Sequence, residues 1–422
     1  MCSRLGITAC VTFYLSVFAV VGHAEHGSRH EDIVRGTAHS SRAPHGIEQF
    51  FGTGVTWGAG LTQVYQHNTH GGLSTKSRSG RYAGSYDVQA SADLERILGW
   101  SNSTAYLLLE GGWPRDGCID PTAVGSYFGV DGDAIHGEWI DVAELWFLRS
   151  FAGDRVFVQV GKADLSAGIE YRDVISAFDL NAYANDEHGQ FLNGAFVNNP
   201  TIPFPAYTLS LSAVAKLSDQ WQFAAAGATQ SGDADIDETA SWASDDEGFF
   251  VIAQASFLPA SRTDLWLRTG EYHLGAWWTG GGDLTSQDEL TGVYLSAARE
   301  IFRESDDPGD EQGLGVFARW GWVDGDAAEL DCFWSVGLQY RGLFALRDDD
   351  VVGIGFARGT FTGSDSQAGL AGSEQVLELY YSIAVARWMT LSPDLQYIAN
   401  PGGRSDSDDA LIVGLRGRIL IE

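Results

Sequence analysis

The amino-acid sequence predicts an all-β fold, namely a transmembrane antiparallel β-barrel of about 16 strands. Apolar and polar residues alternate along most of the chain from Val55 onward, as they do in strands with one face in an apolar phase and one in water. The 422 residues include 52 glycines and 12% aromatic residues, and the mean hydropathy is −0.09. Such a near-neutral value is expected when lipid-facing side chains are averaged with lumen-facing ones.

The first 24 residues are predicted to be a secretory signal peptide. Arg4 supplies a basic start, an apolar run extends from Val11 to Val21, and Gly22-His-Ala24 has the small residues of a cleavage site. The run is shorter than the roughly 20 residues that a helical anchor needs. Residues 25–50 are polar and aperiodic, so we expect a flexible N-terminal segment there and an outer-membrane barrel domain over 51–422.

No later segment is apolar over the length of a membrane-spanning helix. A chain that enters a bilayer without such helices must form a closed barrel, because only helices and closed barrels pair every backbone polar group within the lipid. The expected strands are 55–67, 82–94, 104–112, 142–149, 155–162, 207–217, 220–230, 248–258, 262–274, 291–301, 313–323, 332–341, 351–360, 374–387, 388–399 and 409–421. Many are close to the roughly 9 to 11 residues that a tilted strand needs to cross a membrane.

The expected hairpin over residues 374–399 shows the alternation most clearly. Leu377 and Leu395 fall on one face of its strands, and Glu378 and Gln396 fall on the other. In a closed barrel this pattern places the leucines toward lipid and the polar residues toward the lumen.

The expected connections have two lengths. Short ones such as 217–220 alternate with longer acidic ones such as 304–311 and 402–409, an asymmetry typical of outer-membrane barrels. Two further segments, 113–141 and 163–206, are too long for turns and contain few alternating runs. Loops of that length within a compact domain are usually functional.

The charge and the cysteines limit the functions that the chain can have. The formal net charge is −30, and removal of Arg4 with the signal peptide leaves −31, so the basic footprint of a nucleic-acid-binding protein is absent. Cys2 and Cys10 also leave with the signal peptide. The sequence does not decide whether the remaining Cys118 and Cys332 form a disulfide.

The sequence contains no motif that indicates catalysis. We find no Gly-x-Ser-x-Gly, His-Glu-x-x-His, Cys-x-x-Cys or phosphate-binding glycine loop. The aspartates of Asp233-Ala-Asp-Ile-Asp237 lack the glycine and the glutamate of a calcium loop. No cofactor and no metal site are therefore expected, and the chain is not expected to be an enzyme.

Three segments resemble the carbohydrate-selective porins of the Gram-negative outer membrane. They are Phe191-Leu-Asn-Gly-Ala-Phe196, Pro200-Thr-Ile-Pro-Phe-Pro205 and the expected hairpin from Glu374 to Gly403, above all its part Leu391-Ser-Pro-Asp-Leu-Gln-Tyr-Ile-Ala-Asn-Pro-Gly-Gly403. The resemblance covers roughly residues 47–422. It implies a 16-stranded barrel whose inward-folded loops narrow the lumen into a constriction that favours sugars, glucose-like ones included. It also implies small saccharides, outer-membrane lipid, lipopolysaccharide and the barrel assembly machinery as partners.

The chain departs from the family pattern in two features. It ends Arg418-Ile-Leu-Ile-Glu422, whereas outer-membrane barrels usually end in an aromatic residue, and its loops are unusually acidic. The substrate preference of the family is therefore not carried over intact.

A sugar channel needs side chains that replace water around hydroxyl groups and flat aromatic faces that contact the pyranose ring. Binding must stay weak, because conduction requires release. The candidates for the pore constriction, taken from the strand phase above and from the segment 163–206, are Arg172, Asp179, Asn193, Trp266, Arg268, Arg319, Glu378, Asp394, Gln396, Arg416 and Arg418. Each has the alternative role of bracing the barrel, because lumen walls are polar throughout.

Two other functions stay open at this point. The chain could be a secreted or periplasmic soluble β-protein that binds carbohydrate, which would not require detergent for extraction. It could also be a barrel enzyme acting on lipid, with a Ser and a His brought together from distant strands.

Overall fold

The computed structural model describes the barrel and much of its loops. The described residues are 54–114, 118–133, 140–166, 170–171, 174–175, 178–184, 190–205, 207–230, 248–259, 270–280, 289–305, 307, 310–325, 328–362 and 372–421. The expected signal peptide (1–24) and N-terminal segment (25–50) lie outside them. No helix in these ranges is both long and apolar enough to cross a membrane.

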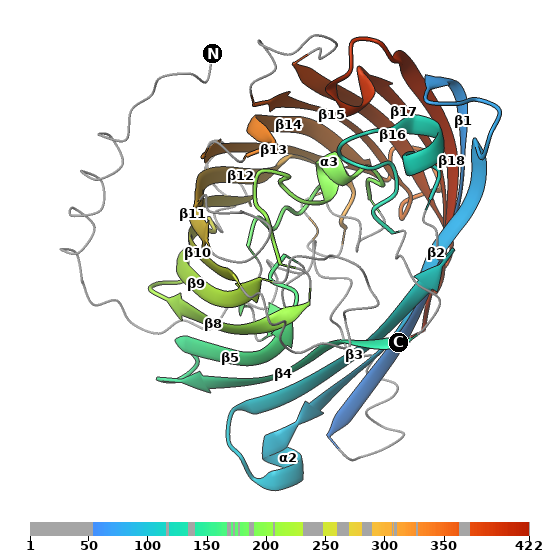
Figure 1. Ribbon diagram of the computed structural model, residues 1–422. Helices are drawn as coiled ribbons and strands as arrows, with labels where there is room; N and C mark the ends of the chain where they lie inside the picture. The colour runs from blue at the N-terminus through green and yellow to red at the C-terminus, as the bar shows by residue number, and fades with distance from the viewer. Residues whose placement is uncertain are drawn as a thin grey trace.

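Sixteen described strands form one closed antiparallel barrel (Figure 1), which confirms the predicted fold class. Each strand pairs with its neighbours in the chain, and β1 closes the barrel against β18. The strands are β1 (Val55–Gly72), β2 (Gly80–Asp93), β3 (Ser103–Trp113), β4 (Asp141–Phe151), β5 (Val156–Ala163), β8 (Thr208–Lys216), β9 (Trp221–Gln230), β10 (Gly248–Phe257), β11 (Gly270–Gly280), β12 (Leu290–Arg303), β13 (Gly313–Asp324), β14 (Leu330–Arg341), β15 (Val351–Phe361), β16 (Ser373–Ala386), β17 (Met389–Ala399) and β18 (Asp408–Ile421).

The two faces of the wall follow the predicted alternation. Leu377 on β16 and Leu395 on β17 are 41% and 40% exposed, whereas Glu378 and Gln396 are fully buried. Glu378 pairs in register with Gln396 across the two strands, so the polar residues share the inner face. The leucines therefore face lipid and the polar residues face the lumen, as the hairpin pattern predicts.

One predicted strand overlaps its barrel strand only in part. The strand expected at 262–274 shares residues 270–274 with the observed strand Gly270–Gly280, while every other predicted strand overlaps its barrel strand over most of its length. The observed strand contains the adjacent Trp277 and Trp278, and Trp277 is buried. Since neighbouring residues of a strand point to opposite faces, one tryptophan points inward and the other outward, and two consecutive bulky residues hide this alternation in the sequence.

The two rims of the barrel differ. β1 begins and β18 ends at one rim, called the terminal rim below, and the connection between β2 and β3 at this rim contains the short helix α2 (Leu94–Leu98). The two longest connections leave the opposite rim, called the loop rim, and join β3 to β4 and β5 to β8.

Both long connections fold into the barrel. Their described parts are called the first inner segment (118–133) and the second inner segment (178–205, with 185–189 outside the description). A helical turn at Asp120–Val124 lies in the first, and the short helix α3 (Gly194–Val197) lies in the second. Figure 1 shows α3 inside the ring of strands. The connection from β5 to β8 also contains the two-stranded sheet of β6 (Glu170–Tyr171) and β7 (Val174–Ile175).

Apolar side chains seat the second inner segment against the inner wall. Phe191 and Phe196 are fully buried, and the Phe191 ring centroid lies 5.5 Å from that of Phe317 and 4.9 Å from that of Tyr380. Gly355 on β15 makes room for them, because a Cβ atom there would lie 2.6 Å from the Phe196 ring. The wall is therefore shaped to receive these two rings.

The lipid-facing assignment can be tested with Leu377→Arg. An arginine near the bilayer midplane should lower the free energy of unfolding by about 2–4 kcal/mol, whereas Leu343→Arg in the turn between β14 and β15 should cost about 0–1 kcal/mol. Equilibrium urea unfolding of the barrel in lipid vesicles measures both values. Equal costs at the two positions would contradict the assignment.

Candidate functional site

Glu374, near the start of β16, fixes the first inner segment. Its carboxylate accepts hydrogen bonds from Ser126 Oγ at 2.6 Å and from the Tyr127 amide at 2.8 Å. It also accepts a bond from the Gly402 amide at 2.5 Å, in the connection between β17 and β18. One buried carboxylate thus joins the inner segment, the wall and a loop of the rim.

Glu378, four residues further along β16, fixes the second inner segment. Its two carboxylate oxygens accept the Leu192 and Asn193 amides at 2.6 and 2.9 Å. The Asn193 side chain then donates to Gln396 Oε1 at 3.0 Å, and Gln396 Nε2 donates to the Val130 carbonyl of the first inner segment at 2.9 Å. The hairpin of β16 and β17 therefore contacts both segments.

Arg416 on β18 joins the two inner segments to each other. Its guanidinium forms an ion pair with Asp133 of the first segment at 2.9 Å and donates to the Gln190 carbonyl of the second. The Gly132 amide also donates directly to the Leu192 carbonyl at 2.7 Å. The segments consequently form one assembly inside the lumen.

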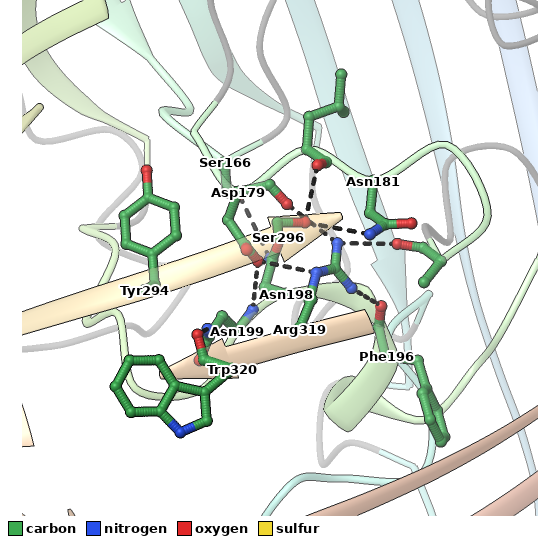
Figure 2. Close-up of polar contacts among 12 residues, drawn as sticks. Ser166, Asp179, Asn181, Phe196, Asn198, Asn199, Tyr294, Ser296, Arg319 and Trp320 are labelled. Atoms are coloured by element: carbon green, nitrogen blue, oxygen red, sulfur yellow. Dashed lines mark hydrogen bonds and ion pairs between the residues drawn. The ribbon is translucent and has the colours of Figure 1, made fainter. Parts of the chain in front are cut away.

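Arg319 on β13 anchors the second segment on the other side (Figure 2). Its Nε lies 3.0 Å from Asp179 Oδ2, and its Nη atoms donate to the carbonyls of Phe196 and Ala184. The Asn199 amide completes the site by donating to Asp179 Oδ2 at 2.9 Å. The planar fork of an arginine can bind a carboxylate and several carbonyl groups at once, and both members of this ion pair are buried.

Two further contacts extend this anchor across β11 and β12. Asn181 Nδ2 donates to Ser296 Oγ at 3.1 Å, as Figure 2 shows. The Ala182 amide donates to Glu271 Oε1 at 2.5 Å. The start of the second segment is thus held by three adjacent strands.

Burial changes the acidity of the carboxyl groups on the inner segments. Desolvation raises the pKa of Asp131 to about 8, with a smaller contribution from the charge of Asp133, while Arg416 acts in the opposite direction and Asp394 adds to the rise. Asp131 Oδ2 is buried and has no hydrogen-bond partner, and a buried charge without a partner is costly. This carboxyl group therefore keeps its proton at neutral pH.

Asp179 is affected less strongly. Desolvation raises its pKa to about 6, and the neighbouring Arg319 guanidinium offsets part of this rise. At neutral pH Asp179 is therefore mostly ionised, as its ion pair requires.

The structure brings most of the predicted site residues together around the inner segments. Seven of them are buried between a segment and the wall: Asp179, Asn193, Arg319, Glu378, Asp394, Gln396 and Arg416. Arg418 is half-buried and lies beyond the segments. Arg172, Trp266 and Arg268 lie outside the described residues. Direct contact between any of these side chains and a saccharide stays a prediction.

Several anchoring residues were not predicted from the sequence. Glu374 lies four residues before Glu378 on the same strand and therefore faces the same side of the wall. The alternation of apolar and polar residues could by itself have identified Glu374 as facing the lumen. Asp133 and Glu271 could not have been found in this way, because their partners, Arg416 and the Ala182 amide, lie far from them in the sequence.

The structure also bears on the disulfide and on metal binding. Cys118 and Cys332 are both buried and no disulfide joins them, which answers the question that the sequence left undecided. Within the ranges given above, no group of three or more His, Cys, Asp or Glu side chains is placed to hold a metal ion.

Comparisons with known proteins give one consistent result. The family model described as carbohydrate-selective porin, OprB family, matches residues 77–420. The chain is 22% identical over 393 residues to Porin B of Pseudomonas aeruginosa, with 83% of this chain and 84% of the relative covered. An uncharacterized protein of Aquifex aeolicus is 44% identical over 66 residues, which cover 16% of this chain.

Solved structures show the same fold. The structure of Pseudomonas putida OprB at high pH matches with a TM-score of 0.71 and 20% identity, over 89% of this chain and 96% of that one. The low-pH structure of the same protein matches with a TM-score of 0.53 and 18% identity, over 88% and 94% of the two chains.

The anchoring role of Glu378 can be tested with Glu378→Ala. The substitution leaves the buried amides of Leu192 and Asn193 without their acceptor, which costs about 1–3 kcal/mol for each group, so amide hydrogen exchange at these two residues should become at least about tenfold faster. Glu304→Ala serves as a control, because Glu304 accepts a bond from Tyr340 at the terminal rim. Unchanged exchange in Glu378→Ala would show that other contacts hold the segment.

The raised pKa of Asp131 predicts that docking of the first inner segment depends on pH. The docked carboxyl group keeps its proton up to about pH 8, whereas an undocked one loses it near its ordinary value of 3.8. Docking should therefore weaken as the pH rises from about 4 to about 8. Fluctuations of the ion current through single channels should increase over this range. They should increase less in Asp131→Asn, where Asp120 of the same segment, whose pKa burial raises to about 7, still titrates. The exposed-turn variant Asp348→Asn should behave like the unaltered protein, and equal pH dependence in all three would refute the role of Asp131.

Proposed function

The chain belongs to the OprB family of carbohydrate-selective porins and is an outer-membrane channel for carbohydrates, not an enzyme, and we propose that small saccharides diffuse passively past a constriction formed by its two inner segments. The observation that carries this proposal is the anchoring of both segments inside the barrel by Glu374, Glu378, Arg319 and Arg416. A loop held at that many points keeps a fixed shape, which a size-selective opening requires.

The position of the anchors indicates which part of the wall meets the solute. They lie on β11 to β13, on β16 to β18 and on the loop-rim half of β1, where Gln66 donates to the Val130 carbonyl at 2.6 Å. Most inward-facing residues on the terminal-rim half of β1, β2 and β3 are only partly covered, Asp87, Gln89 and Tyr106 among them. The free passage is therefore expected to run between the segments and this part of the wall.

The predicted site residues then have two kinds of role. The seven buried ones hold the edges of the segments at a fixed distance from the wall, and so set the width of the opening. Arg418 would contact the solute itself. Arg172, Trp266 and Arg268 stay candidates for the same constriction.

The finer partners belong to the same proposal. Residues 1–24 would direct export, and the barrel assembly machinery would insert the folded strands. The outward-facing apolar residues would contact lipid and, near the loop rim, lipopolysaccharide. The exposed leucines of β16 and β17 support the contact with lipid.

Reconstitution in planar bilayers tests the proposed function. The purified protein should conduct ions, and D-glucose should reduce the current reversibly, whereas a neutral amino acid at the same concentration should not. Absence of any conductance by detergent-extracted, folded protein would overturn the proposal. Recovery of the protein without detergent would favour the soluble carbohydrate-binding alternative.

A further inference from the structure

Two arginines on β18 mark the edge of the region that the inner segments cover. Arg416 and Arg418 are two residues apart and therefore face the same side of the wall. Arg416 is 1% exposed and lies against Asp133 and Gln190 of the segments. Arg418 is only half-buried. The covered region thus ends between these two positions, and the wall on the terminal-rim side is open to the lumen.

Two polar side chains of β2 extend toward Arg418 across β1. Asp87 pairs in register with Gly60, and Gln89 pairs with Gly58. A Cβ atom at Gly60 would lie 2.1 Å from Asp87 Oδ2, and one at Gly58 would lie 3.1 Å from Gln89 Nε2. Because Gly58 and Gly60 have no side chain, Asp87 and Gln89 have room to lie over β1. The carboxyl group of Asp87 also interacts electrostatically with Arg418.

An aromatic side chain continues this row on β3. The Tyr106 hydroxyl donates to Gln89 Oε1 at 2.9 Å. The Tyr106 ring stacks on Trp146 of β4, with centroids 4.8 Å apart and an interplanar angle of 19°. Trp146 is fixed in turn, because its Nε1 donates to Glu144 Oε2 at 3.1 Å. The orientation of Tyr106 is thus set by contacts at its hydroxyl and on one ring face.

We propose that Arg418, Asp87, Gln89 and Tyr106 form a saccharide subsite on the terminal-rim side of the constriction, which rests on the proposed function of the channel. Guanidinium, carboxylate and amide groups supply the donors and acceptors that replace water around sugar hydroxyls. An aromatic ring supplies an apolar surface for the less polar face of a pyranose. All four side chains are half-buried, which distinguishes them from the seven residues beneath the inner segments.

The position of the subsite agrees with a transport role. Arg418 lies three residues before the last residue of β18, Gln89 lies four before the end of β2, and Tyr106 lies three after the start of β3. All are therefore close to the terminal rim, whereas the inner segments enter from the loop rim. A saccharide that passes the constriction next meets this row, where side chains partly open to water bind it weakly enough for release.

Variants of the row test the proposal through the dissociation constant for D-glucose, measured from the sugar-dependent decrease of single-channel current. Gln89→Leu removes the amide at nearly constant size, and Tyr106→Leu removes the aromatic face. Each should raise the dissociation constant by about fivefold to tenfold while the sugar-free conductance is retained, which also shows that the barrel has folded. Tyr106→Phe keeps the ring and should have a smaller effect than Tyr106→Leu.

Matched controls lie on the outer face of the same wall. Gln63→Leu on β1 and Tyr82→Leu on β2 should leave the dissociation constant unchanged, because Tyr82 is 62% exposed on the lipid side and Gln63 shares its phase. If the unaltered channel is blocked by glucose and the row variants are blocked equally well, the subsite is wrong and the proposed function stands. If the unaltered channel does not respond to glucose at all, the proposed function is contradicted, and with it the subsite that rests on it.

Discussion

The hydrogen bonds from loop amides to the carboxylates of β16 are the interaction on which the interior of this channel depends. Backbone N–H groups that leave water must find an acceptor, and the inner segments place many such groups inside the barrel. Glu374 and Glu378 supply acceptors for one segment each. They lie about 13 Å apart along the strand, at roughly 3.3 Å per residue, so the two segments are held at two different levels of the lumen.

Charged side chains add a second constraint. A buried charge is costly unless a partner and further hydrogen bonds satisfy it, and the buried Arg319 and Arg416 each meet this condition. Arg319 binds Asp179 together with carbonyl groups of the second segment, and Arg416 binds Asp133 together with the Gln190 carbonyl. Their removal would leave buried carboxylates and carbonyls without donors. In this protein, therefore, the most polar positions of the lumen wall are chiefly structural.

The remaining lumen-facing residues include those of the proposed saccharide subsite. The boundary between the two groups runs between Arg416 and Arg418, which share a face of β18 but differ in whether a loop covers them. Glycines of β1 allow Asp87 and Gln89 to lie flat against the wall beside Arg418. In the proposed subsite, hydrogen-bonding groups that lie along the wall and stay partly open to water would suit weak binding and fast release.

The sequence by itself determined the barrel, its strands and the two faces of the wall, because a strand in lipid must alternate and the alternation can be counted in residues such as Leu377 and Glu378. It also placed most of the lumen-facing candidates on the correct side. Only the tertiary structure decided which of them the inner segments cover, and it showed that β11 continues to Gly280, beyond the predicted end at residue 274. The reason is physical: strand periodicity is a local property, whereas the path of a long loop depends on partners such as Asp133 and Arg416, which meet from opposite parts of the chain.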